Sequence, residues 1–148
     1  MPVGELMDAL VRLSKFKKEN KELLTYLLFE KANEANFIRG TQNEIEELFS
    51  GVDTESLYFA KKTIRKILRR VNKYAQYSGL ATTNIELLIH FCGQMDNLKI
   101  DIHQSTTMQN LYMNQVKKIK KLIGTLHEDL QFDYQDRIAG LRDTKRST

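Results

Sequence analysis

The sequence predicts an all-α fold of six or seven helices arranged as antiparallel hairpins. The chain has 148 residues, and its only proline is Pro2. β-Sandwiches and barrels need many tight turns, which favour proline and glycine. This chain has only seven glycines, and they stand singly. Apolar residues recur at helical spacing along most of its length. We therefore expect either a helical bundle or a short HEAT-like array.

The composition is typical of one globular domain, with 41% apolar and 28% charged residues. We expect residues 1–148 to form a single all-helical domain, in which residues 142–148 are a frayed basic tail. One cysteine, Cys92, allows no internal disulfide and favours a cytoplasmic location. The first residues lack the pattern of a signal peptide, and no apolar run is long enough to span a bilayer. We therefore expect no membrane partner.

Two helices are predicted in the first 40 residues. The first covers about residues 3–18 and places Leu6, Leu10 and Leu13 on one stripe. The second runs from about residue 20 to residue 39 and has apolar residues on almost every side. Because a helix that is apolar all round is usually buried, we expect this second helix to be central. Gly40 is expected to end it.

Three Thr-x-x-Glu boxes begin at Thr41, Thr83 and Thr125, so consecutive boxes are 42 residues apart. A threonine with a glutamate three residues later can satisfy the free amides at a helix start. We therefore expect helices to begin at all three threonines, the first being short and ending at Gly51. The spacing matches the period of HEAT-like repeats. The alternative is that Thr-x-x-Glu is simply a common helix start.

Between these boxes, the fourth predicted helix covers about residues 54–78. Asp53 or Thr54 is expected to cap it, and Gly79 is expected to end it. A polar stretch over residues 96–106 separates the fifth helix from a sixth that begins near residue 107. Gly93, inside the fifth helix, is expected to mark close packing between helices.

The fourth predicted helix carries seven cations against one acid, Glu55, a net charge of +6. Its cations lie opposite its apolar stripe, with aromatic residues interleaved. Such a face could follow a nucleic-acid backbone while an aromatic ring stacks on a base. The candidate face for an anionic partner consists of Lys62, Arg65, Lys66, Arg69, Arg70, Lys73, Phe59 and Tyr77.

The alternative interpretation is that this face is simply solvated or is paired within the chain. Residues 30–55 carry seven acids against two bases, a net charge of −5, and could cover the basic helix. A second basic cluster on the sixth helix could instead extend the field if both faced one side. That cluster consists of Lys117, Lys118, Lys120 and Lys121.

The preferred function is a non-enzymatic interaction or scaffold module that binds a protein or a second copy of the chain. The first alternative is nucleic-acid binding through the basic face of residues 54–78. The second is a small enzyme or metal-binding bundle that uses Glu86 and His90, which stand four residues apart on the fifth helix. No catalytic, cofactor or metal-binding residue is assigned, and no cofactor is expected. Cys92 is expected to be a small buried apolar residue.

Overall fold

A computed structural model describes residues 1–141, which contain seven α-helices and no β-strand. The all-α prediction is therefore confirmed, whereas the tail predicted at residues 142–148 lies outside the described residues. No described helix has the length and hydropathy needed to cross a bilayer. The elements in order are α1 (Val3–Ser14), α2 (Lys18–Thr25), a π-helical turn (Tyr26–Glu30), α3 (Glu34–Ser50), α4 (Leu57–Ser78), α5 (Ala81–Asn97), a 3-10 turn (Ile102–Gln104), α6 (Thr106–Ile123) and α7 (Glu128–Ala139).

The chain divides into two compact units, Met1–Phe37 and Ile38–Thr148. The boundary falls within the first turns of α3. That residues 1–148 form one domain stays a prediction, and each unit is described by itself.

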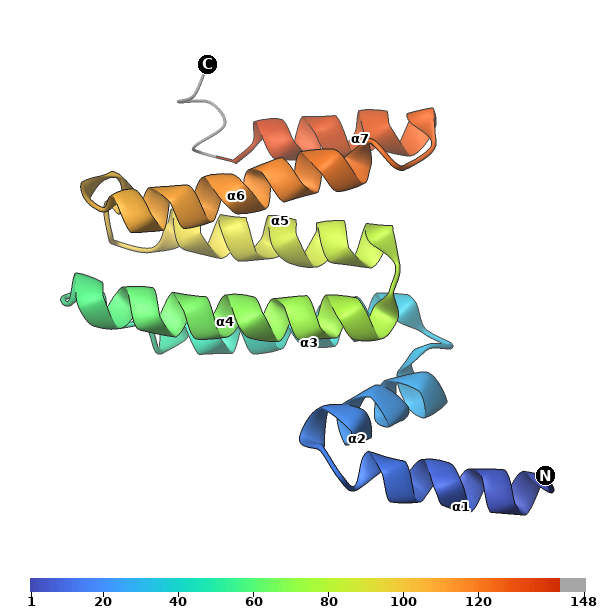
Figure 1. Cartoon of the computed structure of the whole chain (residues 1–148). Helices are drawn as coiled ribbons and strands as arrows, with labels where there is room; N and C mark the ends of the chain where they lie inside the picture. The colour runs from blue at the N-terminus through green and yellow to red at the C-terminus, as the bar shows by residue number, and fades with distance from the viewer. Residues whose placement is uncertain (142–148) are drawn as a thin grey trace. The chain divides into compact units, whose positions relative to one another are not determined.

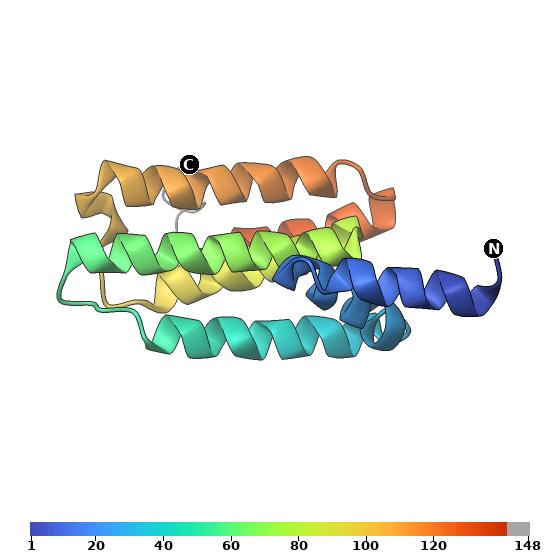
Figure 2. The same cartoon turned by 60° about the horizontal axis from the view of Figure 1, so that its bottom comes forward.

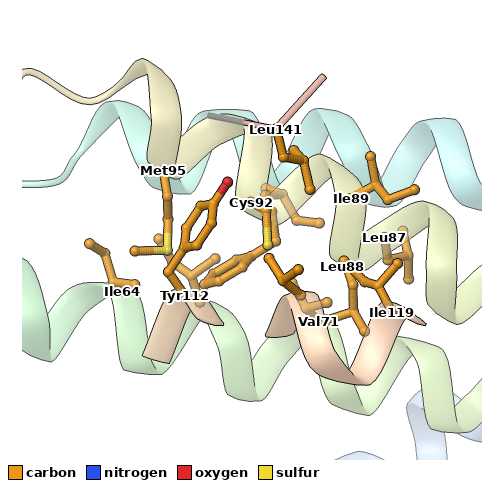
Figure 3. Packing of buried hydrophobic residues seen from close by; sticks show 14 of the residues in the cluster. Ile64, Val71, Leu87, Leu88, Ile89, Cys92, Met95, Tyr112, Ile119 and Leu141 are labelled. Atoms are coloured by element: carbon orange, nitrogen blue, oxygen red, sulfur yellow. The ribbon is translucent and has the colours of Figure 1, made fainter. Parts of the chain in front are cut away.

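The second unit is an antiparallel helical bundle. From α3 to α7, each helix runs opposite to the one before it (Figures 1 and 2). The predicted helical hairpins are therefore confirmed. Side chains of α4, α5 and α6 meet in one apolar core (Figure 3), in which Ile64, Leu88 and Ile119 are fully buried. Cys92 is also fully buried there, as predicted.

The first unit has few buried side chains. Tyr26 is its main anchor, because the Tyr26 hydroxyl donates a hydrogen bond to Glu34 Oε1 at 2.7 Å. The ring of Tyr26 also meets the ring of Phe37 edge-on, with 4.7 Å between centroids. The prediction of a central helix over residues 20–39 is wrong, since the chain leaves helical geometry near residues 31–33 and Phe29 is 73% exposed.

The predicted helix end at Gly40 and helix start at Thr41 are also wrong. Both residues lie inside α3, which begins at Glu34 after the Asn33 side chain accepts a hydrogen bond from the Asn36 amide. Thr41 is only 4% exposed and continues a buried stripe of Phe37, Ile45 and Phe49 at four-residue spacing. Burying that stripe outweighs the roughly 1 kcal/mol that an interior glycine costs.

The other two boxes do not start helices either. α5 begins at Ala81, so Thr83 lies within its first turn, fully buried. The Thr125 hydroxyl donates to the carbonyl of Leu122 at 2.6 Å, and His127 caps α7 instead. The three threonines thus occupy different positions relative to their helices. The 42-residue spacing does not reflect a structural repeat.

The predictions for Gly93 and for the N-terminal cap of α4 are also wrong. Nothing lies within 4 Å of a Cβ added at Gly93, so this glycine does not mark close helix packing. α4 is capped by Ser56 rather than Asp53 or Thr54, because Asp53 accepts a hydrogen bond from the Glu55 amide in the preceding turn.

Candidate nucleic-acid interface

α4 is the longest of the described helices and is held firmly at both ends. At its start, the amide of Phe59 donates to Ser56 Oγ at 3.4 Å. At its end, Gly79 has φ of 71°, a left-handed conformation that suits glycine, and its amide bonds to the carbonyl of Ala75 at 2.9 Å. A buried stripe that includes Ile64 and Val71 faces the core. The basic residues are therefore directed away from the core on a well-defined helix.

On one edge of α4, acidic α3 covers the basic face. Arg70 Nε lies 3.4 Å from Glu44 Oε1, and the Tyr74 hydroxyl donates to Glu44 Oε2 at 2.5 Å. The Arg70 guanidinium also lies over the Tyr74 ring, 4.8 Å from its centroid. Internal pairing between the basic helix and the acidic segment therefore occurs here, as one of the two sequence interpretations predicted.

On its other edge, α4 borders a groove that contains no acidic side chain. The groove has a volume of about 600 Å³. Seven of its eight lining residues come from α4, and Thr107 comes from the first turn of α6. We call this site the basic groove, and its lining residues are Tyr58, Lys61, Lys62, Arg65, Leu68, Arg69, Asn72 and Thr107.

The four cations of the basic groove have no acidic partner within residues 1–141. Lys62, Arg65 and Arg69 are exposed, and Lys61 is half-buried. From Lys61 to Arg69, the charges span about 12 Å along the helix, at about 1.5 Å per residue. Four like charges so close together repel one another unless an anion lies between them. The arrangement therefore suits an extended anionic ligand.

α6 brings part of the second basic cluster to the same place. Lys118 Nζ donates a hydrogen bond to Asn72 Oδ1 at 3.4 Å, and Asn72 lines the basic groove. In Figure 2, α4 lies between α6 and α3. Lys118 of α6 therefore adds a cation at one edge of α4, and Glu44 of α3 adds an acid at the other. The positive field at the groove is therefore larger than the charge of α4 alone implies.

The structure separates the eight predicted face residues into several groups. Lys62, Arg65 and Arg69 line the basic groove. Lys66 is exposed but does not line the basic groove. Lys73 is half-buried and already interacts with another group of the protein.

The remaining three predicted residues lie outside the groove. Arg70 pairs with Glu44. Tyr77 is half-buried with its ring 6.1 Å from that of Tyr74, and Phe59 is exposed. Tyr58, rather than either of the predicted stacking residues, is the aromatic side chain in the groove.

Five other lining residues are absent from the predicted face. Helical periodicity places Tyr58 and Lys61 on the same surface of α4 as the predicted cations. Lys61 lies beside the apolar stripe, and this position directs its side chain into the groove. Leu68 and Asn72 border that stripe too. No sequence pattern indicates that Thr107 lines the groove, because its place beside α4 depends on how α6 packs.

Glu86 and His90 do not form a metal site together, because each meets a different helix. Glu86 accepts hydrogen bonds from the Tyr134 hydroxyl at 2.9 Å and from Arg137 Nη2 at 2.8 Å, both on α7. His90 Nε2 lies 3.3 Å from Glu46 Oε1 of α3, without the geometry of a hydrogen bond. Within residues 1–141, no three potential metal ligands come together.

The contacts of Glu86 shift the pKa of three groups, and the hydrogen bond to Glu86 raises the pKa of Arg137. Burial raises the pKa of the Glu86 carboxyl, but hydrogen bonds from Arg137 and Tyr134 and the Arg137 charge outweigh it, so the net pKa is lowered. Burial and the bond to Glu86 together raise the pKa of Tyr134 to about 12. We call Glu86, Tyr134 and Arg137 the α5–α7 clasp.

Comparison of the chain with protein-family models, with curated proteins and with solved structures finds no match in any of the three.

Proposed function

We propose that this protein is a non-enzymatic helical module that binds a nucleic acid by its phosphate backbone in the basic groove. The observation that carries the proposal is the row of four cations without acidic partners, Lys61, Lys62, Arg65 and Arg69. A cytoplasmic location suits a chain whose one cysteine, Cys92, is buried and can form no disulfide within the chain.

A nucleic acid fits this row better than a folded acidic protein does. Lysine and arginine release counterions when they neutralise phosphates, and a backbone offers those phosphates at regular intervals. Arg65 and Arg69 also present planar guanidinium groups that can bind phosphate with two hydrogen bonds. An acidic protein surface would need carboxylates in the same regular line.

The test is a binding titration with fluorescently labelled DNA and RNA oligonucleotides at low salt. We expect the double variant Arg65→Glu with Arg69→Glu to lose about tenfold or more in affinity, since two phosphate contacts become repulsive. For four contacts with a single strand, the slope of log K against log salt should be about −3. The charge reversal should flatten this slope.

The matched control is Lys117→Glu with Lys120→Glu, which changes the same net charge at exposed positions of α6 outside the groove lining. This control should retain most of the affinity. Circular dichroism should show that both double variants keep their helices. Equal losses in the two variants, or no binding of the wild type to any oligonucleotide, would contradict the proposal.

A second candidate function, self-association, is favoured by the surface of α1. Of 17 large apolar side chains exposed among residues 1–141, 11 belong to Met1–Phe37. In α1 they include Val3, Leu6, Leu10 and Leu13, whose 3-4-3 spacing is that of a coiled-coil seam. Such a seam is left uncovered in the described single chain and suits a second helix.

The occupant we propose for this seam is α1 of a second copy, packed antiparallel. The acids of α1, Glu5 and Asp8, lie in its first half, whereas Arg12 lies in its last turn and Lys15 follows it. Antiparallel pairing sets the acidic half of each copy against the basic half of the other. A two-fold axis of this kind gives a closed, self-complementary dimer.

Sedimentation equilibrium over a range of protein concentrations tests this pairing. The wild type should be a dimer that dissociates on dilution, and Leu6→Glu with Leu13→Glu should be monomeric because two charges enter the seam. Leu130→Glu with Phe132→Glu, at exposed apolar positions of α7, is the control and should not change the mass. A wild type that is monomeric at every concentration refutes the pairing.

A further inference from the structure

Two aromatic rings stand exposed at the start of α4, beside the cations of the basic groove. Tyr58 is 67% exposed and Phe59 is 55% exposed. Their rings meet edge-on, with 5.3 Å between centroids. Tyr58 lines the groove, and Phe59 does not. Phe59 therefore supports the ring of Tyr58 from one side while much of the Tyr58 ring stays open to solvent.

We infer that the basic groove binds single-stranded nucleic acid in preference to duplex, with one base stacked on Tyr58. This inference rests on the nucleic-acid function proposed above. An aromatic ring adds to the binding affinity only when it can stack on an open base face. The bases of a duplex are already stacked on one another. A duplex would offer the groove only phosphates, so Tyr58 would contribute little to its affinity.

The spacing along α4 gives the bound strand a register. Tyr58 precedes Lys61 and Lys62 by three and four residues, so these side chains lie on one face, a single turn apart. Arg65 and Arg69 follow on the next two turns, each about 5.4 Å further along the axis. A base on Tyr58 places its neighbouring phosphates over the lysines and later ones over the arginines. The strand therefore runs along α4 and has its stacked base at the N-terminal end of the helix.

Two neutral hydrogen-bonding groups complete the groove, one from the first turn of α6 and one from α4. Thr107 provides a hydroxyl and Asn72 an amide, and the Asn72 carbonyl oxygen already accepts from Lys118. Such groups bond sugars and phosphates without reading base sequence. We therefore expect a preference for single strands without strong sequence preference.

The absence of tryptophan from the chain allows a direct optical test. In Tyr58→Trp, the only indole stands at the proposed stacking position. Three probes of equal length should be compared, namely a single-stranded DNA oligonucleotide, an abasic strand with the same number of phosphates, and a duplex. We expect quenching of tryptophan fluorescence by the oligonucleotide and little quenching by the abasic strand. Phe132→Trp, at an exposed position of α7 outside the groove, is the control and should not be quenched.

The matching affinity measurement uses Tyr58→Ala and Tyr58→Phe. Loss of the ring should weaken binding of the oligonucleotide about tenfold, the size expected for one stacked base. Binding of the abasic strand and the salt slope should stay as in the wild type. Tyr58→Phe keeps the ring and should keep the affinity. Circular dichroism of Tyr58→Ala checks that the first turn of α4 remains folded.

The outcomes separate the two proposals. Equal affinities for all three probes, with no effect of Tyr58→Ala, would overturn the stacking inference while leaving phosphate binding in place. A preference for duplex would overturn it too. Failure of the wild type to bind any probe at low salt would instead overturn the nucleic-acid function itself.

Discussion

The α5–α7 clasp shows how one carboxylate can join two helices. Glu86 is half-buried, and the Arg137 guanidinium approaches it through both terminal nitrogens. The Arg137 guanidinium also lies over the Tyr134 ring, with its carbon 5.4 Å from the ring centroid, which adds a cation–π interaction. α7 has few buried side chains of its own, among them Tyr134 and Ile138. The clasp is therefore a large part of what holds α7 in place.

The clasp should make stability depend on pH at both ends of the scale. The pKa of Glu86 is lower in the folded protein, so the contribution of Glu86 is present above about pH 4.5 and is lost as pH falls through the folded pKa. The pKa of Tyr134 is raised to about 12, so the contribution of Tyr134 is present below pH 10 and is lost as pH rises through about 12.

Urea unfolding of Glu86→Gln checks the acid side. We expect a loss of about 1–2 kcal/mol in the free energy of unfolding at pH 7, because charged hydrogen bonds are weakened in a partly exposed site. The difference from the wild type should shrink at pH 3. Asp136→Asn, an exposed acid of α7, is the control and should change little. Tyr134→Phe should remove the alkaline dependence between pH 10 and pH 12. A constant difference at all pH values would refute the assignment.

Sequence reasoning identified Glu86 and His90 as notable but could not find their partners. Tyr134 and Arg137 stand 48 and 51 positions away from Glu86, and no local pattern links them. The four-residue spacing correctly placed Glu86 and His90 on one helix. Which neighbouring helix each would meet depends on how α3 and α7 pack against α5.

In α3, the burial of an apolar stripe overrides a local sequence signal for a helix end. Gly followed by Thr-x-x-Glu is a good pattern for ending one helix and starting another. The stripe of Phe37, Thr41, Ile45 and Phe49 extends through it, however, and favours one continuous helix. By contrast, Gly79 ends α4 as predicted, because no apolar stripe continues through it and its φ is positive.

This contrast predicts opposite effects for the same substitution. Gly40→Ala should stabilise the protein by about 0.5–1 kcal/mol, since Gly40 is helical, exposed, and has nothing within 4 Å of an added Cβ. Gly79→Ala should destabilise it by roughly 1–2 kcal/mol, because alanine resists the left-handed conformation. Chemical denaturation of the two variants beside the wild type measures both. Destabilisation by Gly40→Ala would show that α3 needs a flexible point there.

The net charge of +4 hides an uneven distribution of charge over the chain. One edge of α4 is neutralised by Glu44, while the other carries four cations without acidic partners among the described residues. The sequence predicted the basic helix, its cations and the competing acidic segment. It could not predict that one edge of α4 would pair with acidic α3 while the other edge kept its cations unpaired by acids within the described part of the chain. Nor could it predict that Asn72 and Lys118, 46 positions apart, would meet.

The exposed apolar surface divides in the same uneven way between the two units. The sequence predicted the stripe of Leu6, Leu10 and Leu13, but not that it would stay uncovered. Periodicity identifies which face is apolar and does not say what covers it. In the second unit, the apolar stripes of α4, α5 and α6 cover one another. In the first, the apolar side chains of α1 stay exposed, which is why we propose self-association at this end of the chain.

The alternating directions of α3 to α7 have a kinetic consequence. Because α4, α5, α6 and α7 each pack against the next helix along the chain, this part of the bundle can assemble stepwise from neighbouring hairpins. Topologies dominated by such local contacts fold fastest, on the microsecond-to-millisecond timescale. The interior of the chain also contains no proline, so no step has to wait for peptide-bond isomerisation. The second unit is thus arranged to collapse quickly, which shortens the time for which its apolar helices are open to aggregation.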